Sequence, residues 1–165
     1  MKEKNTIKIK RYKSPCGVLL LGSFGEKLCD RVNQRLKRIL CAEFEISTSE
    51  IIEESIEQLN EYFAGQRKEF SVPLLFVGTD FQKTVWNELL KIPFGKTISY
   101  GEMAKHIGRP QAVRAVANAN GANSISIFAP CHRVIGSDHS LTGYGGGLSA
   151  KKFLLELESQ PRLML

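Results

Sequence analysis

The sequence Pro130-Cys131-His132-Arg133-Val134 places a cysteine, a strong nucleophile, directly before a histidine. A cysteine attacks as its thiolate, so a nearby base or positive charge that favours loss of the thiol proton makes it reactive. His132 can supply the base, and Arg133 can supply the charge. These residue types in this order predict a covalent, cysteine-based reaction centre at Cys131.

Glu158 is the carboxylate expected to support this centre. Residues 148–158 have the pattern of a helix, and Glu158 falls on the apolar stripe marked by Leu154 and Leu157. An inward carboxylate needs a hydrogen-bonding partner, and His132 is a suitable one. The alternative is that Glu158 is a solvated residue at a fraying helix end.

Two short helices are expected ahead of the cysteine. Ser99 and Glu102 have the spacing of a capping box, and the helix that they open should end at Gly108. Pro110 suits the first turn of a second helix. Two helices joined by a tight turn form a candidate helix-turn-helix, whose second helix would hold Arg114 near a groove of a duplex. An ordinary packed pair of helices has the same pattern.

Positive charge is concentrated around these helices and the cysteine. The chain has 165 residues and a formal net charge of +6. A surface that faces a polyanion would have this composition, so nucleic acid is the leading expected partner, with a solvated basic face as the alternative. The basic residues from position 91 to 133 are Lys91, Lys96, Lys105, Arg109, Arg114 and Arg133, against the single acid Glu102.

The first half of the chain has the pattern of a small sheet followed by a helix. Alternation at residues 7–9 and the apolar run 18–21 indicate strands, with a hairpin turn at 23–26. Apolar residues at helical spacing predict a helix between residues 47 and 63. A last strand is expected at residues 70–72, before a proline.

We divide the chain near residue 78 into domains 1–78 and 79–165, because turn-forming residues lie there. The second domain should begin with a helix that has Asp80 as its N-cap, Trp86 in the core and an end before Pro93. With strands in the first domain and mainly helices in the second, the fold class expected is α+β.

The sequence has no long apolar run at its start, and residues 18–21 are too few to span a bilayer. We therefore expect a cytoplasmic protein, associated with the nucleoid if the source is prokaryotic, and no membrane partner. No C-x-x-C spacing occurs, and disulfides do not persist in a reducing compartment, so free thiols, no metal and no cofactor are expected. The cysteines are Cys16, Cys29, Cys41 and Cys131.

Across residues 79–159 the chain resembles the 6-O-methylguanine-DNA methyltransferases, also called methylated-DNA-protein-cysteine S-methyltransferases. The resemblance implies a ribonuclease-H-like α/β domain followed by a helical, winged-helix-like domain with a helix-turn-helix. It rests on Ser99-Tyr100, Arg114-Ala115-Val116, Asn123, Pro130 to Val134, Tyr144 to Leu148 and Glu158, and more loosely on Ser14-Pro15-Cys16-Gly17 and Tyr62-Phe63-Ala64-Gly65.

The chemistry that the resemblance implies is transfer of the alkyl group of 6-O-alkylguanine in duplex DNA to Cys131, with repair of 4-O-methylthymine left open. The thioether product is stable, so each molecule would act once. His132 would take the thiol proton through a bridging water or a local turn, and Glu158 would orient His132. Asn123 resembles a hinge between the recognition helix and the active-site segment, and Tyr100 would donate a proton or hydrogen bond to the departing guanine.

The family likeness also implies that a monomer binds the minor groove of double-stranded DNA and extrudes the alkylated base into a pocket. Arg114 would occupy the place that the base vacates, and Tyr100 would push the neighbouring phosphate. The residues expected to contact DNA are Arg114, Tyr100, Gln111, Ala112 and Asn118, and those expected to line the base pocket are Tyr144, Gly145 and Val134.

Two positions depart from the family pattern: Ser124 stands where proline is usual, and Gly145 stands where some relatives have serine. Neither change removes a reacting group. The main alternative function is a non-catalytic module that binds alkylated DNA and recruits repair factors, although such proteins replace the cysteine. A papain-type hydrolase, a helix-turn-helix transcription factor and a purely structural Cys131 explain less of the pattern.

Overall fold

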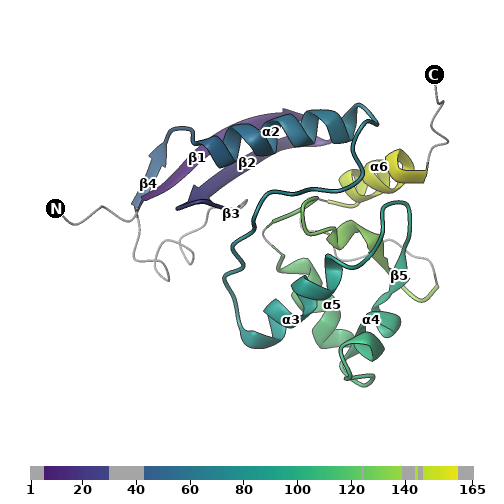
Figure 1. The fold of residues 1–165 in the computed structure, drawn as a ribbon. Helices are drawn as coiled ribbons and strands as arrows, with labels where there is room; N and C mark the ends of the chain where they lie inside the picture. Colours follow the sequence, from purple (N-terminus) through teal and green to yellow (C-terminus); the bar gives the residue numbers. More distant parts are fainter. Residues whose placement is uncertain (1–5, 30–42, 124, 139–143, 145–146, 160–165) are drawn as a thin grey trace. The chain divides into compact units, whose positions relative to one another are not determined.

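The computed structural model describes residues 6–29, 43–123, 125–138, 144 and 147–159 (Figure 1). The chain forms two compact units, Met1–Val77 and Gly78–Leu165. The first unit combines a sheet with a helix, and the second is mainly helical with one small sheet. The expected α+β fold is confirmed.

The first unit is built on a four-stranded sheet of order β3-β2-β1-β4. Strands β1 and β2 pair antiparallel, as do β2 and β3, whereas β1 and β4 are parallel. The turn expected at residues 23–26 is present between β2 and β3, where Gly25 has a φ of 62°. The strands are β1 (Thr6–Ser14), β2 (Gly17–Phe24), β3 (Lys27–Cys29) and β4 (Glu43–Ile46).

Helix α2 (Glu50–Phe63) packs against this sheet (Figure 1). It begins after Ser49, whose side chain accepts a hydrogen bond from the amide of Ile52. On the β1 side of the contact, the hydroxyl of Tyr12 donates to Asn60 Oδ1 at 2.6 Å. The predicted helix is thus confirmed, with a start slightly later than residue 47.

The strand expected at residues 70–72 is absent, so that prediction was wrong. The amide of Ser71 donates to Gln58 Oε1 at 3.0 Å, and Gln58 Nε2 donates back to the Ser71 hydroxyl at 2.7 Å. A side chain of α2 therefore satisfies the backbone group that a neighbouring strand would have used. Only an isolated bridge between Leu28 and Leu74 continues the sheet in this region.

The second unit packs α3, α4 and α5 against one another and pairs β5 with β6 in a two-stranded parallel sheet. Trp86 of α3 lies in the core, and its indole N–H donates to the carbonyl of Ala119 at 2.8 Å. The elements are α3 (Asp80–Leu89), β5 (Ile98–Ser99), α4 (Tyr100–His106), α5 (Val113–Gly121), the 3₁₀ turn η1 (Cys131–Arg133), β6 (Val134–Ile135) and α6 (Leu148–Ser159).

Two helix starts differ from the prediction. The N-cap of α3 is Thr79 instead of Asp80, because Thr79 forms a reciprocal capping box with Gln82. Helix α5 begins at Val113, so Pro110 lies before the helix and not in its first turn. After α4 the chain reverses through Gly108 at a φ of 75° and a further turn that ends at Ala112, which delays the second helix.

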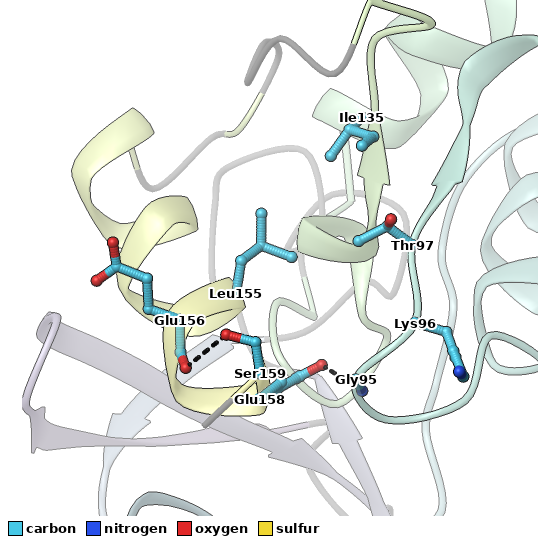
Figure 2. A pocket seen from close by; sticks show the side chains of 8 residues that line it. All are labelled: Gly95, Lys96, Thr97, Ile135, Leu155, Glu156, Glu158 and Ser159. Atoms are coloured by element: carbon cyan, nitrogen blue, oxygen red, sulfur yellow. Dashed lines mark hydrogen bonds between the residues drawn. The ribbon is translucent and has the colours of Figure 1, made fainter. Parts of the chain in front are cut away.

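A pocket of about 250 Å³ lies between α6 and the strands of the small sheet (Figure 2). Glu158 reaches its wall, but Cys131 does not line it, so this pocket is not the place where a substrate would meet the thiol. The lining residues are Gly95, Lys96, Thr97, Ile135, Leu155, Glu156, Glu158 and Ser159.

Within the described residues, no helix is both long and apolar enough to cross a bilayer. The same part of the chain contains no group of three or more His, Cys, Asp and Glu side chains placed to hold a metal ion. Cys16, Cys29 and Cys131 form no disulfide within the described part of the chain. Cys41 lies outside the described residues.

Candidate active site

A short buried loop delivers Cys131, and Asn123 holds this loop at both ends. The Asn123 amide donates to the carbonyls of Ile125 at 3.4 Å and Ala129 at 3.0 Å, while its oxygen accepts from the Ile125 amide at 3.0 Å. Ile127, at the tip, has a φ of 73°, which is uncommon for a β-branched residue. One side chain therefore fixes a sharp turn immediately before the cysteine.

Cys131 is 3% exposed and begins a 3₁₀ turn that includes His132 and Arg133. The amide of Val134 closes this turn by donating to the Cys131 carbonyl. In an extended strand, the side chains of Cys131 and His132 would point to opposite faces. The 3₁₀ turn removes this constraint. A local turn was one of the two predicted routes for proton transfer, and a bridging water was the other.

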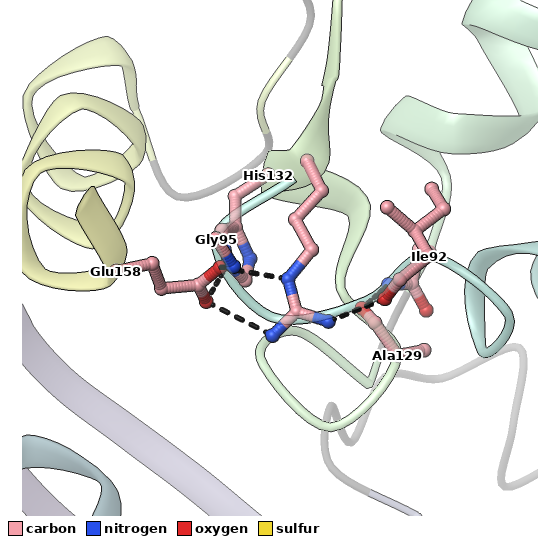
Figure 3. Close-up of polar contacts among 7 residues, drawn as sticks. Ile92, Gly95, Ala129, His132 and Glu158 are labelled. Atoms are coloured by element: carbon pink, nitrogen blue, oxygen red, sulfur yellow. Dashed lines mark hydrogen bonds and ion pairs between the residues drawn. The ribbon is translucent and has the colours of Figure 1, made fainter. Parts of the chain in front are cut away.

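His132 and Glu158 form a buried pair, as expected from the apolar stripe of α6 (Figure 3). Nε2 of His132 lies 2.6 Å from Oε2 of the carboxylate and donates to it. This bond fixes the tautomer, so Nδ1 is left as an acceptor, and it has no hydrogen-bond partner among the described residues. A neutral His132 can therefore take up a proton at Nδ1.

Arg133 binds Glu158 through two nitrogens, a contact that the sequence pattern did not predict. Its Nε and one terminal nitrogen donate to the two carboxylate oxygens at 2.8 and 3.1 Å, and its other terminal nitrogen donates to the Ile92 carbonyl at 2.7 Å (Figure 3). The amide of Gly95 adds a fourth donor to the carboxylate, at 3.3 Å. A buried carboxylate needs a nearby cation, and this requirement could have predicted from the sequence that Arg133 binds Glu158.

These contacts set the protonation states of the buried pair. Burial raises the pKa of Glu158, but the hydrogen bonds and charges of His132 and Arg133 outweigh it and hold that pKa far below its ordinary value. Burial lowers the pKa of His132, more than its bond to Glu158 raises it. Because Arg133 already balances the carboxylate, protonating His132 would leave a net buried charge.

Lys151 is a second buried cation near the cysteine that the sequence pattern did not predict. It is fully buried, its ammonium donates to the Val134 carbonyl at 2.6 Å, and it lies 5.8 Å from the ring centroid of Tyr100. Burial lowers its pKa, while the negative charge of the Cys131 thiolate opposes that change. Lys151 shares an inward face of α6 with Glu158, seven residues later, so helical spacing could have found it.

Two residues of the predicted site, Tyr100 and Val134, lie beside Lys151. Tyr100 is the first residue of α4 and is 6% exposed, and Val134 is fully buried directly after the 3₁₀ turn. Tyr144 is half-buried. Gly145 lies outside the described residues.

Of the residues expected to contact DNA, Tyr100 is buried in this network. The other four lie on the outer side of α5 and ahead of it. Arg114 and Asn118 are exposed on the helix. Gln111 is exposed and Ala112 is half-buried in the preceding turn. Helices α4 and α5 pack against each other, as in a helix-turn-helix.

Two family profiles together match nearly the whole chain. The profile described as "6-O-methylguanine DNA methyltransferase, DNA binding domain" matches residues 80–160. The profile described as "6-O-methylguanine DNA methyltransferase, ribonuclease-like domain" matches residues 7–76.

Curated relatives have the corresponding name. A methylated-DNA--protein-cysteine methyltransferase of Methanosarcina acetivorans is 48% identical over 149 residues, which are 89% of this chain and 95% of the relative. A protein of the same name from Mycobacterium bovis is 60% identical over 104 residues, or 63% of each chain.

Solved structures of the Mycobacterium tuberculosis protein OGT have a similar fold. Its R37K variant superposes with a TM-score of 0.83 at 44% identity, covering 96% of both chains. The complex of OGT with DNA gives a TM-score of 0.80 at 46% identity, covering 93% of this chain and 92% of the other.

Proposed function

The chain belongs to the 6-O-methylguanine-DNA methyltransferase family, and from this premise we propose that Cys131 is the residue that accepts the alkyl group. The protein is a DNA-repair methyltransferase that transfers an alkyl group from DNA to a cysteine of its own. The observation that carries the assignment is the buried pair of His132 and Glu158 beside Cys131.

The first step is loss of the thiol proton. His132 is neutral before reaction, donates through Nε2 to Glu158, and takes the proton of Cys131 at Nδ1, either across the 3₁₀ turn or through one water. Glu158, held ionised by Arg133, stabilises the positive charge that then forms on His132. The ammonium of Lys151 favours the thiolate electrostatically.

The second step is displacement at the alkyl carbon. The Cys131 thiolate forms the sulfur–carbon bond as the bond between that carbon and O6 of guanine breaks, and the electron pair remains on the base. Tyr100 donates a proton or a hydrogen bond to the base, which leaves as guanine. The nearby Lys151 ammonium stabilises negative charge that develops on Tyr100.

The product limits each molecule to one reaction. Water does not readily attack the alkyl carbon of a thioether and displace the sulfur, so the free thiol of Cys131 is not regenerated. The protein is consumed in proportion to the lesions that it repairs.

We propose double-stranded DNA with an alkylated guanine as the partner. The relative of known structure that was solved in complex with DNA supports binding to DNA. Cys131 is 3% exposed, so a base stacked in a duplex cannot reach it and must be extruded. Arg114, exposed on α5, would fill the place left in the stack.

The test is the intact mass of the protein after incubation with a duplex that contains one 6-O-methylguanine. The expected result is the gain of one methyl group per molecule, located on Cys131. An unmodified duplex and the Cys131→Ala variant should give no gain, whereas Cys16→Ala should react like the wild type. Tight binding of the lesion duplex without a change in mass would refute the proposal and favour a non-catalytic binding module.

A further inference from the structure

Asn120 makes a contact with the reactive residue that the mechanism above does not use. It lies on the inner side of α5, is 1% exposed, and its amide donates to the backbone carbonyl of Cys131 at 3.2 Å. Arg114 lies on the exposed side of the same nine-residue helix. One rigid element thus contains a residue expected to enter DNA and a residue that holds the cysteine backbone.

The contact is separate from the one made by Asn123. Asn123 binds Ile125 and Ala129, at the base of the loop that precedes the cysteine. Asn120 binds Cys131 itself, whose carbonyl already accepts the amide of Val134 inside the 3₁₀ turn. Asn120 therefore links the turn that contains the nucleophile to the helix.

Within the described residues, the side chain of Asn120 has a hydrogen bond to Cys131 and no other. Its Oδ1 is buried and has no hydrogen-bond partner among the described residues. A buried acceptor without a partner costs about 1–3 kcal/mol, a cost that an apolar side chain avoids, so the contact with Cys131 is what the amide at this position provides. The amide cannot rotate to remove it, because Oδ1 would then face the Cys131 carbonyl, which is also an acceptor.

We propose that Asn120 is a positioning residue that couples the placement of α5 on DNA to the orientation of Cys131 toward the alkyl carbon. The inference rests on the proposed function. When α5 binds the duplex, the Asn120 amide keeps the Cys131 backbone at a fixed position relative to Arg114. Displacement of a reacting group by about 1 Å can lower a rate about 100-fold, so one hydrogen bond can matter to the reaction.

The experiment compares Asn120→Leu and Asn120→Ala with the wild type. Asn87→Leu and Asn87→Ala are matched controls, because the Asn87 amide donates to the Lys83 carbonyl on the exposed side of α3. Four quantities are measured: the single-turnover rate of methyl transfer at saturating duplex, the duplex concentration that gives half that rate, the rate of Cys131 alkylation by iodoacetamide, and the thermal midpoint.

For the Asn120 variants, the transfer rate at saturation should fall at least about 10-fold. The half-saturating duplex concentration, the iodoacetamide rate and the thermal midpoint should stay close to the wild-type values. Iodoacetamide diffuses to the thiol and needs no alignment with a bound base, so it separates positioning from thiol reactivity. The Asn87 variants should match the wild type in all four measurements.

A wild-type transfer rate in both Asn120 variants would overturn the inference. A loss of transfer that is matched by an equal loss of iodoacetamide reactivity or by a lowered midpoint in both variants would also overturn it, because Asn120 would then act on the thiol or on the fold. If the wild type itself transfers no methyl group, the proposed function fails first, which is a distinguishable result.

Discussion

Nε2 of His132 donates to Oε2 of Glu158 at 2.6 Å across 26 residues of sequence. Arg133 binds the same carboxylate through two nitrogens, so one buried negative charge is shared by a base and a permanent cation. In the proposed mechanism, this arrangement keeps His132 neutral before the reaction and gives the imidazolium a partner after it.

Replacing Glu158 with Gln should slow methyl transfer by at least about 100-fold, because His132 loses the charge that stabilises its protonated form. The variant should also lose about 3–5 kcal/mol of stability, since it leaves Arg133 buried without a carboxylate. Single-turnover kinetics below the thermal midpoint, together with urea unfolding, measure the two effects separately. Glu156→Gln, exposed on the same helix, should change neither quantity appreciably.

Stability should decrease toward acidic pH. The folded pKa of His132 is depressed from its ordinary 6.5, so its contribution is complete above that pH and is lost as pH falls through the folded value. The pKa of Glu158 is also depressed, so its contribution is lost at still lower pH. The free energy of unfolding, followed from pH 8 to pH 4, should fall less steeply in His132→Gln than in the wild type. An unchanged slope would contradict this account; exposed His106→Gln is the control.

The Arg114→Ala variant should transfer methyl groups from duplex DNA at least about 10-fold more slowly at subsaturating DNA, while iodoacetamide alkylates Cys131 at the normal rate. Arg114 is exposed, so its removal should leave the thermal midpoint unchanged. The salt dependence of DNA binding should weaken by about one counterion if the side chain contacts a phosphate. Lys152→Ala, exposed on α6, tests whether loss of any positive charge has the same effect.

Lys151→Met should lower the rate at which iodoacetamide alkylates Cys131 at pH 7 by about 10-fold, because the thiolate loses a nearby positive charge. The rate should recover as the pH is raised, since the thiol then ionises without help. Lys152→Met, the exposed neighbour, should follow the wild-type profile. Identical profiles for all three proteins would exclude an electrostatic role for Lys151.

Gly78→Ala should destabilise the second unit by about 1–3 kcal/mol through overpacking. A Cβ at this position would lie 2.6 Å from Oε1 of Gln82 and 2.6 Å from a ring carbon of Trp86. Trp86 cannot easily move, because its indole donates to a buried carbonyl. Urea unfolding should show the loss in Gly78→Ala, whereas Gly101→Ala, whose new Cβ would meet only Ser99 Oγ at 3.7 Å, should be at least as stable as the wild type.

The sequence by itself determined the features that depend on local pattern. The order of Cys131 and His132 predicted a nucleophile and its base, and the apolar stripe of α6 correctly placed Glu158 inward. Helical spacing located α2, and capping residues located the start of α4 at Ser99. Local periodicity and capping act within a few residues, so they can be read without the fold.

Apart from the predicted pair of His132 and Glu158, tertiary structure alone decided which distant groups share the buried site. Three contacts of the site join residues that lie 11 to 25 positions apart in the sequence. They are Arg133 with Glu158, Lys151 near Cys131, and Asn120 with the Cys131 carbonyl. The amide of Ser71 donates to Gln58 Oε1 and not to a neighbouring strand, and the strand expected there is absent. Such outcomes depend on which polar groups lose water together, and burial, unlike periodicity, is set only when the whole chain has packed.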